Sequence, residues 1–148
     1  MGASGGDIFT SMKCFLWHPE ASVIGDDRTL REALAVPGRA FRIGGVGPQP
    51  EGQAVFETLT SGSSGAPRRI LRSMESWIAS FAVNAGMFGI GPGCRVAVLG
   101  DLVHSLALYG ALEALHLGAK VALLGGMRPD RQVLALDGAQ VIYATPAQ

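Results

Sequence analysis

The residues from Thr60 to Arg69, TSGSSGAPRR, bring together small hydroxyl side chains, two glycines, a proline and two arginines. Gly62 and Gly65 can take positive φ angles and let the main chain approach a ligand closely, and their amides can form an anion-binding concavity. The hydroxyls add hydrogen-bond donors, and the arginines add fixed positive charge in a fork that matches phosphate oxygens. The stretch therefore predicts a phosphate-binding loop. The alternative is a flexible surface linker, since linkers are also rich in serine and glycine.

The position of this stretch within a pattern of strands and helices favours the phosphate loop. Residues 54–59 alternate well enough to predict a strand before it, and residues 69–72 predict a short strand after it. A helix is then predicted over residues 73–87, with Trp77 and Phe81 on one face. Further strands are predicted over residues 94–99, 119–124 and 140–144, and helices over residues 104–117 and 129–136. Apolar strands that alternate with helices predict an α/β fold, a parallel sheet with helices on both faces.

The first third of the chain is less regular. It predicts a strand at residues 14–17, a short helix at residues 29–35 and a Gly/Pro-rich loop or linker at residues 44–52. We therefore divide the chain into an N-terminal segment, residues 1–52, and an α/β domain, residues 53–148.

The composition bounds the possible partners. Lys plus Arg and Asp plus Glu each number 12, so the net charge is zero, which argues against a nucleic-acid-binding protein. Charged residues make up 16% and hydrophobic residues 48%, whereas soluble domains carry about 25% charged residues. We expect an apolar face that is covered by self-association or by a companion chain.

Other classes of protein are also disfavoured. Cys14 and Cys94 lie far apart and near no histidine cluster, so neither a disulfide framework nor a metal site is expected. The first residues lack the basic and apolar regions of a signal peptide. The apolar stretch over residues 96–127 is interrupted by charged residues and histidines, which argues against a membrane span. We expect a cytoplasmic protein.

The loop resembles the phosphate-loop motif of the AMP-forming acyl-activating superfamily, which includes acyl-CoA synthetases, nonribosomal adenylation domains and firefly-type luciferases. That motif runs Thr-Ser-Gly, Ser or Thr twice, Gly, any residue, Pro and Lys. Its places are occupied here by Thr60, Ser61, Gly62, Ser63, Ser64, Gly65, Pro67 and Arg68. The sequence departs from the pattern twice: Arg68 replaces the lysine, and Glu57 stands where the family usually has an apolar residue.

The resemblance continues downstream, to about residues 55–148 in all. The segment CRVAVLGDLVHSLALYGALEALHLGAKVALL is similar to the family's next block, and VIYATPAQ resembles the strand and turn that begin its acyl pocket. His104 matches a position that lies beside the acyl substrate in many acyl- and aryl-CoA synthetases. Nonribosomal domains have an Asp near this position to hold an amino group. Asp101 comes three residues earlier here, which favours an acid without an α-amino group.

The resemblance implies a two-step reaction. A carboxylate attacks the α-phosphorus of Mg·ATP, and a thiol such as CoA or carrier phosphopantetheine then takes the acyl group. The loop, with Arg68, would hold the ATP phosphates. The family's adenine-binding Tyr-Gly-x-Thr-Glu segment, its ribose-binding Asp and its lid Lys are not found in these 148 residues. The sequence therefore corresponds to a portion of the large N-terminal domain of such a ligase. The alternative is a catalytically incomplete nucleotide- or phosphate-binding or interaction module derived from that family.

Overall fold

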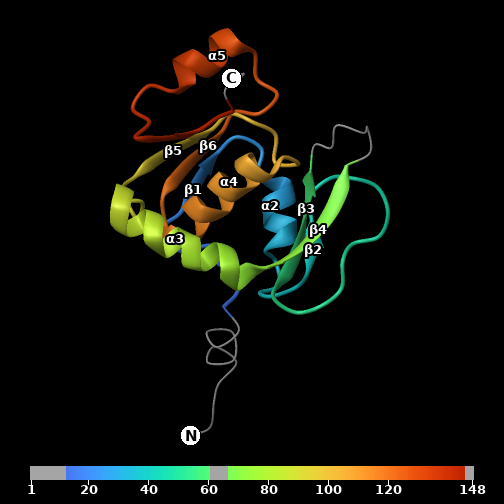
Figure 1. Ribbon diagram of the computed structural model, residues 1–148. Helices are drawn as coiled ribbons and strands as arrows, with labels where there is room; N and C mark the ends of the chain where they lie inside the picture. The colour runs from blue at the N-terminus through green and yellow to red at the C-terminus, as the bar shows by residue number, and fades with distance from the viewer. Residues whose placement is uncertain (1–12, 61–66, 146–148) are drawn as a thin grey trace, which may run out of the picture.

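The computed structural model describes residues 13–60 and 67–145, which form two β-sheets with helices between and around them (Figure 1). The four-stranded sheet has the order β1-β6-β5-β7, and every neighbouring pair in it is parallel. Its strands are β1 (Ser22–Ile24), β5 (Arg95–Val98), β6 (Lys120–Leu123) and β7 (Val141–Tyr143). This sheet confirms the predicted α/β fold class, and the later strands lie within two residues of their predicted positions.

The second sheet has three strands in the order β2-β3-β4. They are β2 (Phe41–Arg42), β3 (Val55–Thr60) and β4 (Arg68–Ser73). β3 and β4 are the two strands predicted on either side of the loop; they pair as an antiparallel hairpin, and β2 adds to β3 in parallel. The sequence pattern did not predict β2, because two residues are too short to show any periodicity.

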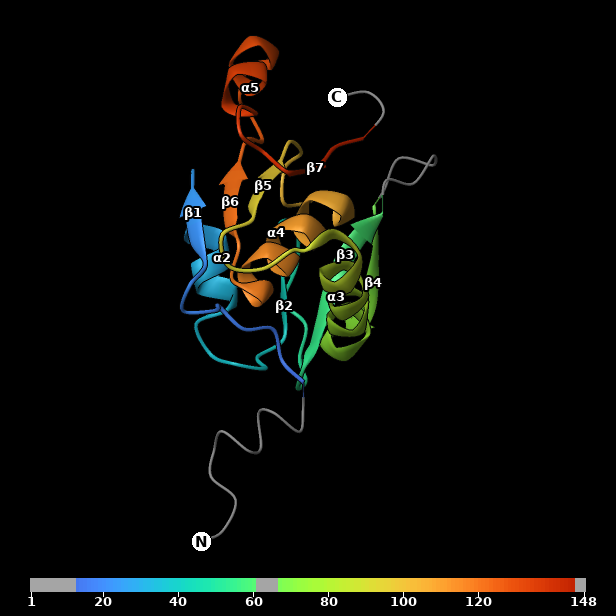
Figure 2. The same ribbon diagram turned by 90° about the vertical axis from the view of Figure 1, so that its left-hand side faces the viewer.

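Four helices complete the described part of the chain: α2 (Arg28–Ala33), α3 (Met74–Phe88), α4 (Ser105–Leu117) and α5 (Pro129–Ala135). Figures 1 and 2 show α4 between the two sheets, which explains why this helix is apolar on nearly every side. Gly118 ends α4 in the left-handed conformation, as expected of a C-terminal glycine. Ser73 caps α3 by accepting a hydrogen bond from the Ser76 amide at 3.2 Å. None of these helices combines the length and the hydropathy needed to cross a lipid bilayer.

Aromatic rings form the centre of the core between the three-stranded sheet, α3 and α4. Phe56 is completely buried and meets Phe15 and Trp77 edge to face, with ring centroids 5.1 and 4.7 Å away. Tyr109 meets Trp77 and Phe81 in the same way, at 5.1 Å from each. Such edge-to-face pairs add to the free energy gained by burial. Trp77, Phe81 and Tyr109 are therefore packed side chains of this core.

The outer face of the four-stranded sheet is only partly covered. Ala97 and Ala122 lie side by side on it, and Leu136 and Ala139, from the α5 region, pack against their cluster. Ile24, at the edge of this face, remains 71% exposed. α5 lies beyond the carboxyl end of β6 and contains no buried residue (Figure 2). The described residues thus include exposed apolar side chains on this face, on α5 and near the end of α3.

The prediction of a strand at residues 14–17 is wrong. In the described part of the chain this segment pairs with no strand and lies against the C-terminal end of α4. The Leu16 amide donates to Nδ1 of His116 at 3.1 Å, and the His18 amide donates to the Leu115 carbonyl at 2.9 Å. The chain then enters the sheet as β1, which pairs with β6.

The hydrogen bond to His116 predicts a dependence of stability on pH. Burial, and secondarily the nearby His18, lower the pKa of His116 from its ordinary value of 6.5. The unfolded chain then binds a proton that the folded chain does not, in the window between the lowered pKa and about pH 6.5. Stability should fall as the pH falls through this window, because a protonated Nδ1 cannot accept from the Leu16 amide.

Urea unfolding of the wild type and of His116→Gln, at a series of pH values from 7.5 down to about 5, measures this effect. The glutamine amide does not titrate, so the difference in stability between the two proteins should change with pH only below about 6.5. A difference that stays constant over the whole range would contradict the assignment to His116.

Candidate functional site

The base of the predicted phosphate loop is closed by the β3–β4 hairpin. Thr60 and Arg68 are directly opposite each other in the register, and the Arg68 amide donates to Oγ1 of Thr60 at 3.3 Å. Ser61, Gly62, Ser63, Ser64 and Gly65, the other predicted members of the loop, lie outside the described residues. The structure thus brings the two ends of the motif together, as expected for a short loop between paired strands.

A groove of about 610 Å³ begins at the end of this hairpin and runs to the N-terminus of α4. A parallel bridge between Leu59 and His104 joins β3 to the turn before α4, so that Thr60 and His104 line the same groove. The full lining is Leu59, Thr60, Gly100, His104, Ser105, Leu106, Ala107, Tyr143 and Thr145. These residues lie at the carboxyl ends of β3, β5 and β7 and in the first turn of α4. For β5 and β7, this is the edge of a parallel sheet at which open α/β folds bind their ligands.

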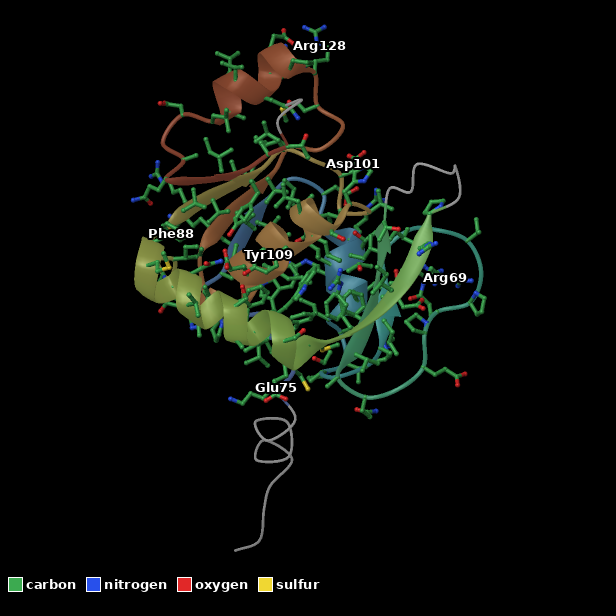
Figure 3. All side chains as sticks on the ribbon, in the orientation of Figure 1. Arg69, Glu75, Phe88, Asp101, Tyr109 and Arg128 are labelled. Carbon is green, nitrogen blue, oxygen red and sulfur yellow. The ribbon has the colours of Figure 1, made fainter. Side chains whose placement is uncertain are left out.

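His104 occupies the N-cap position of α4, but its side chain makes no capping hydrogen bond and is exposed. Only its main chain has a structural role: the amide donates to the Asp101 carbonyl, and the carbonyl accepts from the Leu108 amide, both at 3.0 Å. The first amides of a helix lack acceptors within the helix, and its N-terminus carries partial positive charge. This end of the groove therefore favours an anion. Asp101, labelled in Figure 3, lies on the turn that precedes α4.

Tyr143 forms part of the groove wall and reaches the interior of the protein. Its hydroxyl donates to the carboxylate of Glu113, a residue of α4 that is only 1% exposed. Its ring lies on Gly110, where a Cβ atom would be 2.6 Å from the ring. Burial, followed by the neighbouring Glu113 carboxylate, raises the pKa of the Tyr143 phenol well above its usual range. Tyr143 is therefore a neutral donor to this carboxylate at ordinary pH.

Glu113 has further partners on α3. Asn84 donates from Nδ2 to its carboxylate at 2.8 Å and to the Tyr109 hydroxyl at 3.0 Å, and Ser80 lies 2.6 Å from the same hydroxyl. Figure 3 shows Tyr109 between α3 and α4. Burial raises the pKa of the Tyr109 hydroxyl. This polar network links α3, α4 and β7 inside an otherwise apolar core.

The sequence spacing gave no sign of this network, since Asn84 and Tyr143 are 29 and 30 residues away from Glu113. The one available signal was a single carboxylate inside an apolar helix. A buried charge requires hydrogen-bond partners from elsewhere in the fold.

A second buried charge supports the hairpin. The side chain of Arg42, on β2, is 1% exposed and forms an ion pair with Glu57 of β3 at 2.9 Å. The five N–H groups of its guanidinium make five hydrogen bonds: one to Glu57 and the others to the carbonyls of Gly44, Val46, Gly47 and Pro48. The glycine-rich stretch predicted as a loop or linker is thus a loop folded around a guanidinium. The role of Glu57, one of the two departures from the family pattern, is to pair with Arg42.

The described residues contain no group of three His, Cys, Asp or Glu side chains that could hold a metal ion. The donors at the hairpin and at the start of α4 are instead hydroxyls, amides, an imidazole and, next to the loop, the arginines at positions 68 and 69. This set suits phosphate and carboxylate oxygens.

Part of the chain is similar to known acyl-CoA ligases. No protein-family model matches the sequence. The chain is 37% identical over 90 residues to the uncharacterized acyl-CoA ligase YhfT of Bacillus subtilis strain 168, an alignment that covers 60% of this chain and 19% of that protein. ATP-bound MatB from Rhodopseudomonas palustris has a similar fold, with a TM-score of 0.52 and 16% identity over 66% of this chain and 20% of that one. The o-succinylbenzoate CoA synthetase MenE of Bacillus subtilis, solved with its acyl-adenylate intermediate, also has a similar fold, with a TM-score of 0.50 and 19% identity. That match covers 59% of this chain and 23% of MenE.

The fold is therefore that of part of an acyl-CoA synthetase. Over about three fifths of its length the chain is similar in sequence to an acyl-CoA ligase, in agreement with the resemblance carried by the loop motif. The alignment covers only 19% of the length of YhfT, so the chain corresponds to about a fifth of that relative.

Proposed function

We propose that this chain is a portion of an AMP-forming ligase that activates a carboxylic acid with ATP and passes the acyl group to a thiol, such as CoA or carrier phosphopantetheine. The observation that carries the proposal is the groove, because it joins the base of the phosphate-loop motif to His104 and to the positive end of α4. A reaction between a carboxylate and a triphosphate requires a site that accepts both anions side by side.

The loop and the groove have separate roles in this proposal. The ATP phosphates are bound by the loop residues Thr60, Ser61, Gly62, Ser63, Ser64, Gly65 and Arg68, with Mg²⁺ brought as the ATP complex. Arg68 follows the loop and stabilises the charge that develops on the departing pyrophosphate. The acyl substrate lies near His104, whose imidazole is exposed and makes no capping hydrogen bond. The position of Asp101, on the turn before α4, supports an acid that lacks an α-amino group.

The alternative is a phosphate-binding or interaction module that does not catalyse adenylation by itself. It rests on the same groove and on the paired ends of the loop, because a phosphate could bind there without a complete ligase. In either case we propose that the exposed apolar side chains, which include Ile24, Val133, Leu134 and Phe88, are covered by a second copy of the chain or by the rest of a ligase.

Calorimetric titration with Mg·ATP and with pyrophosphate tests the proposal. We expect Arg68→Ala to weaken the binding of both ligands by about tenfold or more, because a charge-assisted hydrogen bond to a phosphate oxygen is lost. Arg128→Ala is the matched control, since Arg128 is also an exposed arginine but pairs with Asp130 on a different part of the surface. Equal affinities in the wild type and Arg68→Ala would exclude Arg68 from phosphate binding. An absence of binding in the wild type would favour the interaction module.

A further inference from the structure

The loop held by Arg42 touches three residues, each of which is the sequence neighbour of a proposed site residue. A Cβ atom on Gly44 would lie 2.7 Å from Val103, the residue before His104. A Cβ atom on Gly45 would lie 3.2 Å from Leu59, the residue before Thr60.

The third contact is with Arg69, the residue after Arg68. A Cβ atom on Gly47 would lie 3.2 Å from Nη1 and 3.4 Å from Nη2 of Arg69, so this guanidinium rests on bare main chain. Gly47 has a φ angle of +93°, which residues other than glycine rarely adopt. Figure 3 shows Arg69 on β4, on the side where the chain between β2 and β3 passes.

The loop that makes these contacts is hydrogen-bonded to the Arg42 guanidinium. A loop of glycines and prolines has little side-chain packing to define its shape, and its conformation is set here by carbonyl oxygens that converge on one guanidinium. A further hydrogen bond, from the Arg42 amide to Oε1 of Gln49 at 2.8 Å, fixes the far end of the loop. Glu57 orients the guanidinium from β3, the strand that leads into the phosphate-loop motif.

We infer that Arg42 is a positioning residue for the groove: it shapes the loop of residues 44–48 into a support that holds Arg69, Leu59 and Val103, and through them Arg68, Thr60 and His104. The inference rests on the proposed function only in assigning this support to phosphate binding. The support itself is independent of any ligand.

The experiment uses three variants of the full chain. Arg42→Lys keeps the positive charge and the partner Glu57 but has only three donors in place of five. Gly47→Ala leaves Arg42 intact and places a methyl group against Arg69. Gly126→Ala is the matched control, because Gly126 also has a positive φ angle, +78°, but a Cβ atom there would meet nothing within 4 Å. Circular dichroism first establishes a temperature at which each variant is folded.

Two measurements follow: the backbone amide signals of Thr60, Arg68 and His104 by NMR without ligand, and the dissociation constant for pyrophosphate by calorimetry. We expect Arg42→Lys and Gly47→Ala to shift the Arg68 signal and to weaken pyrophosphate binding by about tenfold, the change expected when one charge-assisted contact is lost. Gly126→Ala should change neither.

The outcomes separate the inference from the proposed function. If the NMR signals shift in Arg42→Lys and Gly47→Ala but the wild type does not bind pyrophosphate, the supporting role of Arg42 stands and the proposed phosphate binding is rejected. Wild-type signals and wild-type affinity in both Arg42→Lys and Gly47→Ala would overturn the inference. If Arg42→Lys does not fold, Gly47→Ala decides the question by the same two measurements.

Discussion

Replacement of Arg42 with methionine is expected to lower the free energy of unfolding by about 3–5 kcal/mol, the usual cost of removing one partner from a buried ion pair. Methionine fills much of the same space but donates no hydrogen bond. The side chain of Glu57, which is 18% exposed, would lose its cation, and four main-chain carbonyls would lose their donor. Urea unfolding followed by circular dichroism measures the loss.

The double variant Arg42→Met with Glu57→Met is the informative control. It removes the unpaired carboxylate but leaves the carbonyls of the loop without donors, so it should recover only part of the lost stability. Recovery to the wild-type value would show that the carbonyl contacts contribute nothing. A loss below about 1 kcal/mol in Arg42→Met itself would contradict the description of Arg42 as the centre of the loop.

The second large effect is expected at Glu113. Leucine in its place should lower the free energy of unfolding by about 2–4 kcal/mol, because the Tyr143 hydroxyl and one N–H of the Asn84 amide, both partly buried, would lose their acceptor. Each buried donor left without a partner costs about 1–3 kcal/mol. The measurement is again urea unfolding, at a pH near 7.

Glu113→Gln is the control for this prediction. The glutamine oxygen can accept from Tyr143, and rotation of the Asn84 amide would present an oxygen to the new NH₂ group. We therefore expect a loss much smaller than that of Glu113→Leu. Equal losses in the two variants would mean that volume or helix packing, rather than hydrogen bonding, determines the effect.

The later elements of the fold could be predicted because their residues carry the signal locally. α3 shows helical spacing and α4 is a long apolar stretch, and they end at Gly89 and Gly118. The strands β5 and β6 are short and largely apolar. The early elements could not be predicted in the same way. β1 and β2 have three and two residues, and both are defined by partners far along the chain. Cys14 to Trp17 has the composition of a strand but lies against a helix end.

The candidate site was predictable in part for similar reasons. The phosphate-loop motif is contiguous, so Thr60 and Arg68 were identified from sequence, and His104 from the next similar block. The contributions of Tyr143 and Arg42 to the groove and its support depend on contacts between segments that are distant in sequence. Composition even pointed away from a fixed structure at residues 44–52, since glycine and proline also make linkers. These residues have a fixed conformation instead because the buried Arg42 donates hydrogen bonds to their carbonyls.

The strand order also bears on how the chain folds as it leaves the ribosome. β1 is synthesised early but pairs only with β6, and Leu16 meets His116, 100 residues away. The central strand β5 receives its second neighbour, β7, only near residue 143. Contacts between such distant segments raise the contact order and slow folding, because the entropy of loop closure is lost before the contacts form. The hairpin of β3 and β4, whose contacts are local, can form much earlier. During synthesis the hairpin can therefore be paired while the three residues of β1 still lack their partner strand, β6.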